Sequence, residues 1–335
     1  MTSPSLRKTA VEGPLPSTEP SHPGPAYSSR FKKILSGPNG LRAGWRLLIF
    51  LVLVAVQFAC VPLITRPLAK IPPPSDLPSG ATTPLALGGG DAVLLLTICI
   101  ASWIMAKIER HKFGDYGLPL RRGLTKEFCF GAVLGFLAIS GTLLAMFLLH
   151  GIRIDGLAIH GTTILISLLL WGLTFLTVGL FEEFGFRGYV QYTLASGIGF
   201  WPAAFVISGL FGLVHLLADL NENVMGSVAV VMFGLLLCLF LRRTGALWCS
   251  VGFHLAYDWT ETFFYGVPDS GVVPYHSLLN SKLTGPHWLT GGKVGPEASL
   301  LTPIALSLVA LAFCRYYREN RYQIFTPRPS PVRAS

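Results

Sequence analysis

Long apolar runs alternate with short polar segments along most of the chain. Several runs approach the roughly 20 residues that an α-helix needs to cross the hydrocarbon core of a membrane. Eight runs can be distinguished, at residues 44–65, 91–106, 128–149, 162–181, 201–217, 224–241, 245–265 and 299–316. The pattern predicts an all-α fold, a polytopic membrane helix bundle with about eight transmembrane helices.

Composition supports this prediction. The 335 residues are 51% hydrophobic and 13% charged, with a mean hydropathy of +0.56. Soluble domains carry roughly 25% charged residues, so the composition excludes an ordinary soluble protein. The cysteines lie in or beside apolar runs without a CxxC spacing, which predicts small buried hydrophobic residues instead of a disulfide or zinc framework. They are Cys60, Cys99, Cys129, Cys238, Cys249 and Cys314.

The distribution of basic residues predicts the orientation. With a cytoplasmic N-terminus, 21 of the 26 lysines and arginines fall on the cytoplasmic side and five on the other. This asymmetry follows the positive-inside rule and predicts that both termini are cytoplasmic. It also accounts for the net charge of +9 without a nucleic-acid partner. We expect a multi-pass protein of the cell membrane, the bacterial inner membrane, in contact with the lipid bilayer.

The polar segments predict the domain organisation. Residues 1–40 are polar and rich in proline, which is typical of a disordered cytoplasmic tail. We expect the transmembrane bundle over 41–317 and a second cytoplasmic tail over 318–335. The loop at 266–298 is too polar and too interrupted to form a domain. No internal repeat indicates the inverted symmetry of many transporters.

Charged residues within apolar runs are costly, so each is a candidate for function. Glu182 and Glu183 end the fourth run, and Arg187 follows. Glu183 and Arg187 are four residues apart and share a helix face, which predicts an ion pair. Glu182 lies about 140° around the helix from Arg187 and can point into a cavity. The alternative is a helix end with solvated interfacial charges.

Two further helices carry polar residues at helical spacing. Phe211 and His215 share a face of the fifth run, and Asp219 and Glu222 extend that stripe. A histidine at such a position can also be an ordinary buried or interfacial residue whose polar atoms are hydrogen-bonded.

In the seventh run, His254 and Asp258 are four residues apart, and Glu261 continues their face. This pair could be a polar clamp between helices or part of a catalytic site.

Glu182, His215, His254 and Asp258 together supply two imidazoles and two carboxylates. This set suits a divalent metal such as Zn²⁺ with an attacking water. It equally suits a metal-free site in which a glutamate activates water and a histidine stabilises an oxyanion. The residue types leave both alternatives open. The motifs HExxH, GxSxG and Walker A are absent.

The three motifs, in this order, resemble the CPBP family of intramembrane proteases, which includes the type II CAAX prenyl endopeptidases. The family pattern is EExxxR, then FxxxH, then HxxxN or HxxxD. It corresponds here to Glu182, Glu183 and Arg187; Phe211 and His215; His254 and Asp258. The resemblance covers residues 125–265.

The resemblance implies an all-helical bundle that opens toward the cytoplasm and cleaves peptide bonds near a membrane anchor. Its substrate would be a membrane-associated peptide or protein. Glu182 and His215 would activate the hydrolytic water. His254 and Asp258 would stabilise the oxyanion or, with Glu182 and His215, bind a metal.

The resemblance also implies a supporting role for Glu183, Arg187 and Phe211. Asp258 stands where many CAAX-processing members have asparagine. A carboxylate at this position favours metal ligation, because an anion would repel the oxyanion unless it were protonated.

Two other functions use the same residues. A transporter coupled to protons or cations could employ the carboxylates and histidines, and a non-catalytic adaptor could retain the scaffold. The paired carboxylate beside histidines favours hydrolysis. One geometric condition must be met. Apolar run lengths put Glu182 at the cytoplasmic end of the fourth helix and His215 near the outer end of the fifth, so the fourth helix must extend past residue 182, or the fifth must begin later or break.

Overall fold

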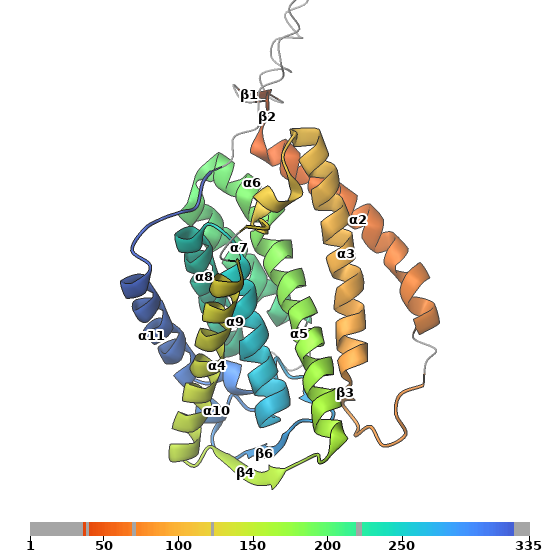
Figure 1. The fold of residues 1–335 in the computed structure, drawn as a ribbon, viewed down its shortest axis with the longest axis vertical. Coiled ribbons are helices and arrows are strands. Elements are labelled where there is room, and N and C mark those ends of the chain that lie inside the picture. The colour runs from red at the N-terminus through yellow and green to blue at the C-terminus, as the bar shows by residue number, and fades with distance from the viewer. Residues whose placement is uncertain (1–35, 38–39, 69–71, 122–123, 219–222, 325–335) are drawn as a thin grey trace, which may run out of the picture.

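The computed structural model describes residues 36–37, 40–68, 72–121, 124–218 and 223–324. In this part of the chain, ten α-helices account for most residues (Figure 1). They are α2 (Ala43–Leu68), α3 (Pro84–Glu109), α4 (Leu124–Leu148), α5 (Thr162–Arg187), α6 (Tyr189–Ile198), α7 (Phe200–Ala218), α8 (Val224–Thr244), α9 (Trp248–Trp259), α10 (His287–Thr290) and α11 (Leu301–Tyr316).

All eight apolar runs form helices, which confirms the all-α prediction. Among the described residues, six helices are long and apolar enough to cross a membrane. They are α2, α3, α4, α7, α8, and α5 together with its continuation α6. The expected eight spans are thus six plus two shorter helices, because α9 has 12 residues and α11 has 16. The predicted tail at 1–40 lies mostly outside the described residues, as do Asp219 and Glu222.

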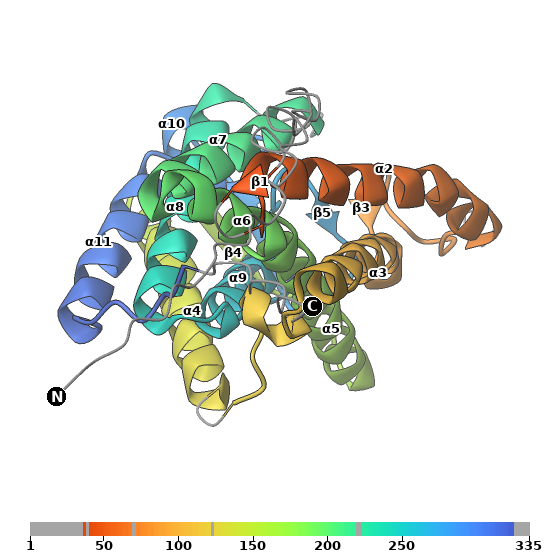
Figure 2. The ribbon, with the colours of Figure 1, turned by 90° about the horizontal axis from the view of Figure 1, so that it is seen from above.

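The helices pack around α9. Helix α4 lies along one side of α9, and α5 and α8 contact it from other sides. Helix α3 packs on α5, and α2 packs on α3 at the edge of the bundle. Seen from above, α2 and α11 lie at opposite sides of the molecule (Figure 2). Helix α9 is therefore the short, enclosed element of the bundle, as its largely buried residues also show.

Glycines allow α4 and α9 to approach closely. A Cβ atom on Gly131 would lie 2.0 Å from the Cys249 carbonyl oxygen, and one on Gly135 would lie 2.2 Å from the Phe253 carbonyl oxygen. The two glycines form a GxxxG motif on α4, a spacing that lets two membrane helices pack backbone to backbone. This contact fixes α9 in depth and rotation.

A buried ion pair holds α2 to the bundle. The Arg46 guanidinium donates two hydrogen bonds to the Glu109 carboxylate on α3. Tyr116 and Tyr189 also donate their hydroxyl groups to Glu109. Since every charge in this network has a partner, the cost of removing it from water is offset.

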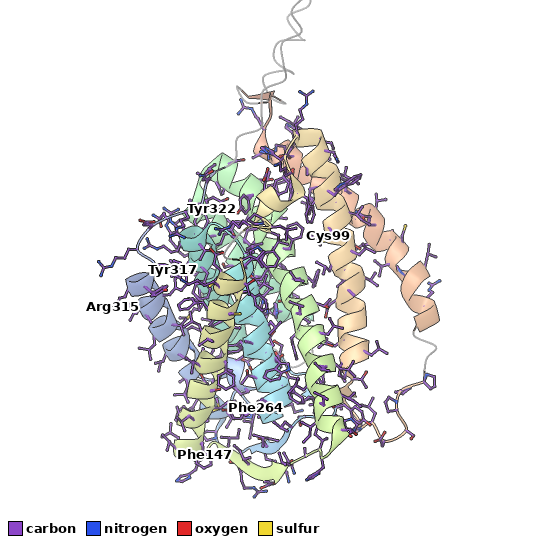
Figure 3. All side chains as sticks on the ribbon, in the orientation of Figure 1. Cys99, Phe147, Phe264, Arg315, Tyr317 and Tyr322 are labelled. Carbon is purple, nitrogen blue, oxygen red and sulfur yellow. The ribbon has the colours of Figure 1, made fainter. Side chains whose placement is uncertain are left out.

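The outward faces of the helices are apolar, as expected in lipid. Leu63, Leu165 and Leu311 are all more than 60% exposed. Of the cysteines, Cys238 and Cys249 are buried as predicted, whereas Cys60 and Cys129 are exposed on the apolar surface. Burial of all six was therefore wrong, because helix sides that face lipid are also apolar. Cys99 on α3 is half-buried (Figure 3).

A small cap closes the end of the bundle opposite the start of α2 (Figure 1). Strand β4 (Ile152–Leu157) pairs antiparallel with β6 (Leu279–Leu283), and β3 (Ala81–Thr82) pairs parallel with β5 (Val273–Pro274). A π-helical turn, η2 (Thr260–Tyr265), continues α9 into the cap, and η3 (Pro296–Ala298) precedes α11. The loop at 266–298 thus folds back onto the bundle.

We expect Gly135→Ala to destabilise the protein, because the new Cβ would meet the Phe253 carbonyl oxygen at 2.2 Å. Overpacking of this kind costs about 1–3 kcal/mol, and it would lower the thermal unfolding midpoint in detergent. Gly141→Ala is the matched control on α4, where the Cβ meets nothing within 4 Å. It should be neutral or slightly stabilising, so equal losses in both variants would contradict the close packing of α4 on α9.

Candidate active site

The four predicted catalytic residues line one cavity of about 170 Å³. Glu182 comes from α5, His215 from α7, and His254 and Asp258 from α9. The cavity lies among these helices, α3, α8 and the cap. Residues from three separate motifs therefore meet at one polar space inside an apolar bundle.

The helix ends explain how Glu182 and His215 meet. Helix α5 runs through Glu182 to Arg187, and α7 is unbroken from Phe200 to Ala218. The first of the two predicted solutions is thus correct: the fourth helix extends beyond its apolar run. Hydropathy ended that run at residue 181 because charged residues follow, although the backbone stays helical.

Glu183 is the most enclosed charge of the site. Arg187 Nη1 donates to Glu183 Oε1 at 2.7 Å, and both side chains are completely buried. The predicted i,i+4 ion pair is therefore present. His254 Nδ1 lies 2.9 Å from the same oxygen. Because a carboxylate only accepts, Nδ1 carries a proton and donates it to this bond.

The other nitrogen of His254 faces two carboxylates. Its Nε2 lies 3.2 Å from Asp258 Oδ2 and 3.5 Å from Glu182 Oε2. The His254 and Asp258 side chains are about 6–7% exposed, whereas the Glu182 side chain is 20% exposed. With three carboxylates around one ring, the charged imidazolium has partners at both nitrogens. Glu182 is the carboxylate of this group that is most accessible from the cavity.

His215 is oriented by its own helix. Its Nδ1 lies 2.9 Å from the Phe211 carbonyl oxygen, which can only accept, so Nδ1 carries the proton of this hydrogen bond. The Phe211 ring packs against the His215 ring at 4.5 Å and under the Arg187 guanidinium at 4.7 Å. Phe211 thus links His215 to the Glu183–Arg187 pair.

Several cavity carboxylates were not among the predicted site residues. They are Asp91 on α3, Asp269 in the cap and Glu297 in η3. Asp91 lies inside an apolar run, which is a signal by itself. Asp269 and Glu297 lie in a polar loop where nothing distinguishes them. Burial, followed by the nearby charges of Asp258 and Glu297, raises the pKa of Asp269 well above its ordinary value.

Two carboxylates of the predicted metal set, Glu182 and Asp258, lie beside His254 Nε2. Glu182, His215, His254 and Asp258 supply no three ligand atoms within 4.8 Å of one another. Among the described residues, only Asp258, Asp269 and Glu297 form such a group. This group offers oxygen atoms alone, whereas Zn²⁺ sites commonly include nitrogen or sulfur ligands.

One family model matches part of the chain. Residues 164–260 match the family model described as type II CAAX prenyl endopeptidase Rce1-like. The matched segment contains all seven motif residues and confirms the predicted resemblance. No curated protein matches the chain. Together with the six apolar helices of the described residues, the match supports a multi-pass membrane protein with a segment similar to CAAX-type proteases.

We expect Glu183→Gln to destabilise the protein strongly. It would leave the Arg187 guanidinium buried without its charge partner, and breaking a buried pair in this way costs about 3–5 kcal/mol. The Arg153–Asp155 pair is the control, because the Arg153 side chain is 62% exposed. Asp155→Asn should cost less than about 1 kcal/mol. Similar unfolding midpoints for the two variants in detergent would contradict a structural role for Glu183.

Proposed function

Starting from this Rce1-like segment, we propose that the protein is an intramembrane endopeptidase that uses a glutamate-activated water. The observation that carries the proposal is the convergence of Glu182 and Asp258 on His254 Nε2. His215 lines the same cavity. The substrate would be a membrane-associated peptide or protein, as the resemblance implies.

Glu182 is the general base in this proposal. Its side chain is partly exposed in a cavity large enough for several water molecules. Glu182 would accept a proton from water while the water oxygen attacks the scissile carbonyl carbon. The Nε2 lone pair of a neutral His215 would accept a hydrogen bond from the same water and orient it. Neither group needs to form a covalent intermediate.

His254 would stabilise the oxyanion. As an imidazolium it donates Nδ1–H to Glu183 and presents Nε2–H to the cavity. Nε2–H would donate to the oxygen that becomes negative in the tetrahedral intermediate. Asp258 beside Nε2 would stabilise the imidazolium charge, which also offsets repulsion between Asp258 and the oxyanion. The proton held by Glu182 would pass to the leaving amine as the C–N bond breaks.

The cellular setting follows from the same resemblance. We infer the bacterial inner membrane from this resemblance, and we infer that both termini are cytoplasmic from the distribution of the basic residues. Whether the substrate carries a lipid does not alter the hydrolytic step. The membrane would instead supply the substrate by lateral diffusion along the apolar helix faces.

Glu182→Gln should abolish cleavage of membrane-anchored peptides by the detergent-purified protein, with a rate at least about 10²-fold lower. The amide keeps the shape of the side chain but cannot accept the proton of water. Asp91→Asn is the matched control, because Asp91 lines the same cavity from α3 and has no role in the proposed step. It should keep most of the wild-type rate.

Either of two results would contradict the proposal. Cleavage that survives in Glu182→Gln would assign the base elsewhere. Proton or cation flux through proteoliposomes that requires Glu182, without cleavage of any peptide in the panel, would favour transport by the same residues.

A zinc chelator should not inhibit the enzyme. We expect the cleavage rate to be the same with and without 1,10-phenanthroline, since the base and the oxyanion donor are both side chains. Inhibition that added Zn²⁺ reverses would show that a metal generates the nucleophile and would replace the glutamate mechanism. An inert phenanthroline isomer that does not chelate is the control.

A further inference from the structure

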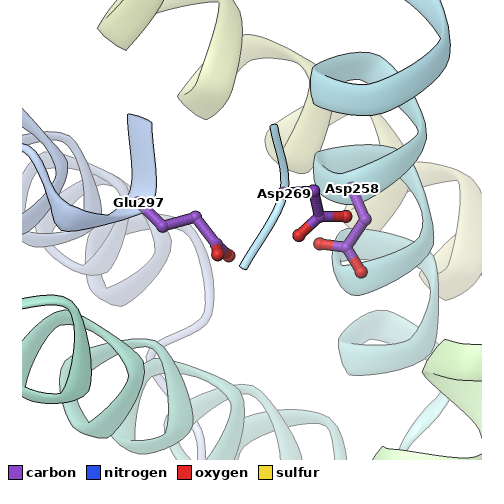
Figure 4. Close-up of side chains that lie close together, drawn as sticks. All are labelled: Asp258, Asp269 and Glu297. Atoms are coloured by element: carbon purple, nitrogen blue, oxygen red, sulfur yellow. The ribbon is translucent and has the colours of Figure 1, made fainter. Parts of the chain in front are cut away.

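A group of acidic residues lies where α9 meets the cap. Ligand atoms of Asp258, Asp269 and Glu297, one from each residue, lie within 4.8 Å of one another. The carboxylates of Asp258 and Asp269 lie side by side, and Glu297 reaches toward them from the other side (Figure 4). Three carboxylates at this spacing repel one another unless protons or a cation neutralise them.

Each of the three carboxylates is oriented by a donor from the protein. His254 Nε2 lies 3.2 Å from Asp258 Oδ2, and the Thr262 hydroxyl donates to Asp269 Oδ2 at 3.0 Å. Ser270 donates both its backbone N–H and its hydroxyl to Glu297 Oε2. Outer partners of this kind fix the direction of carboxylates that ligate metals.

Glu261 supplies a second, independent observation. It follows Asp258 by three residues on the same helical stretch, and its side chain is completely buried. Neither of its carboxylate oxygens has a hydrogen-bond partner among the described residues. Its charge interacts with those of Glu297, Asp269 and Asp258. Its Oε1 lies only 3.4 Å from the position of a Cβ on Gly295, two residues before Glu297.

His254 is the basic side chain beside this group, and it contacts Asp258 alone of the three carboxylates. No lysine or arginine lines the cavity in the described part of the chain. Within the same residues, neither Glu261 nor Asp269 forms an ion pair. A fully buried carboxyl without a hydrogen bond is rare in proteins and needs an explanation. We propose that Asp258, Asp269 and Glu297 bind one hard divalent cation, Ca²⁺, beside the buried Glu261 carboxylate.

The donor set selects the type of cation. All ligands are carboxylate oxygens, which favour Ca²⁺, Mg²⁺ or Mn²⁺ over softer metals. Oxygens that bind one Ca²⁺ at its usual distance lie at most about 5 Å apart, in agreement with the observed spacing. The site lies at the end of the bundle that the basic residues predict to face outward, where Ca²⁺ sites commonly bind with dissociation constants of about 10⁻⁴–10⁻³ M.

Such a cation would connect the cap to α9. Asp269 and Glu297 belong to the cap, whereas Asp258 and Glu261 belong to α9 and its π-helical extension. The cation would hold the cap over the cavity and orient Asp258 beside His254. Its binding does not depend on the proposed hydrolysis, because Glu182 and His215 are not ligands.

The test is calorimetric titration of the full-length, detergent-purified protein with CaCl₂ after washing with EGTA. Wild type should bind one Ca²⁺ per chain, and Asp269→Asn and Glu297→Gln should each weaken binding by at least about tenfold. Ca²⁺ should also raise the unfolding midpoint of wild type. In Ca²⁺-free buffer Asp269→Asn should unfold no earlier than wild type, because it removes a repulsive charge.

Two controls separate this proposal from the hydrolytic one. Asp155→Asn, an acidic residue in β4 outside the group, should bind Ca²⁺ as wild type does. Glu182→Gln should also bind Ca²⁺ normally even though it cleaves nothing. Absence of binding to wild type up to about 10 mM Ca²⁺ would overturn the proposal. So would normal binding by both Asp269→Asn and Glu297→Gln, or binding that is lost only in Glu182→Gln or His254→Ala.

Discussion

The hydrogen bonds that share one oxygen of Glu183 are the constraint on which the site depends. Glu183 Oε1 accepts from Arg187 on its own helix and from His254 on α9. A carboxylate that is completely buried in a membrane bundle must be paired, because removing one partner leaves an uncompensated charge. This requirement fixes both the protonated nitrogen and the direction of the His254 ring. Its Nε2 consequently faces Glu182 and Asp258.

The packing of the other helices keeps α9 in the position at which His254 can donate to Glu183. Helix α9 is too short to cross a membrane by itself, and neighbouring helices enclose it. Gly131 and Gly135 on α4 bring the two backbones close enough that neither helix can rotate or slide freely. Close packing of this kind is rigid, so His254 and Asp258 come from a fixed element. The apolar helix faces turned to lipid do not have to hold their side chains in fixed positions.

Helical periodicity determined how much of the site could be predicted from the sequence. Glu183 with Arg187, and His254 with Asp258, are four residues apart, so local geometry alone brings each pair together. The contact between His254 and Glu183 joins residues 71 positions apart, and no local spacing encodes it. The motif resemblance supplied that link.

Asp269 and Glu297 could not be found in this way, because they lie in a polar loop whose path back to the bundle depends on strand pairing with β3 and β4. In the described residues, six of the eight predicted spans form helices long enough to cross a membrane, whereas α9 and α11 are shorter. Apolar composition marks a buried helix as well as a spanning one, and only length separates the two.

Asp258 belongs to both groups of polar residues, and this explains the departure from asparagine at its position. One of its oxygens contacts His254, a contact that an asparagine side chain could also make. An asparagine would, however, add no charge to the group formed with Asp269 and Glu297. A carboxylate at this position therefore fits a protein whose cap supplies further carboxylates. In the CPBP pattern, the last position can be asparagine or aspartate. We expect aspartate where the loop that covers the site supplies further carboxylates, and asparagine where it does not, because the charge at this position adds to the charge of the loop.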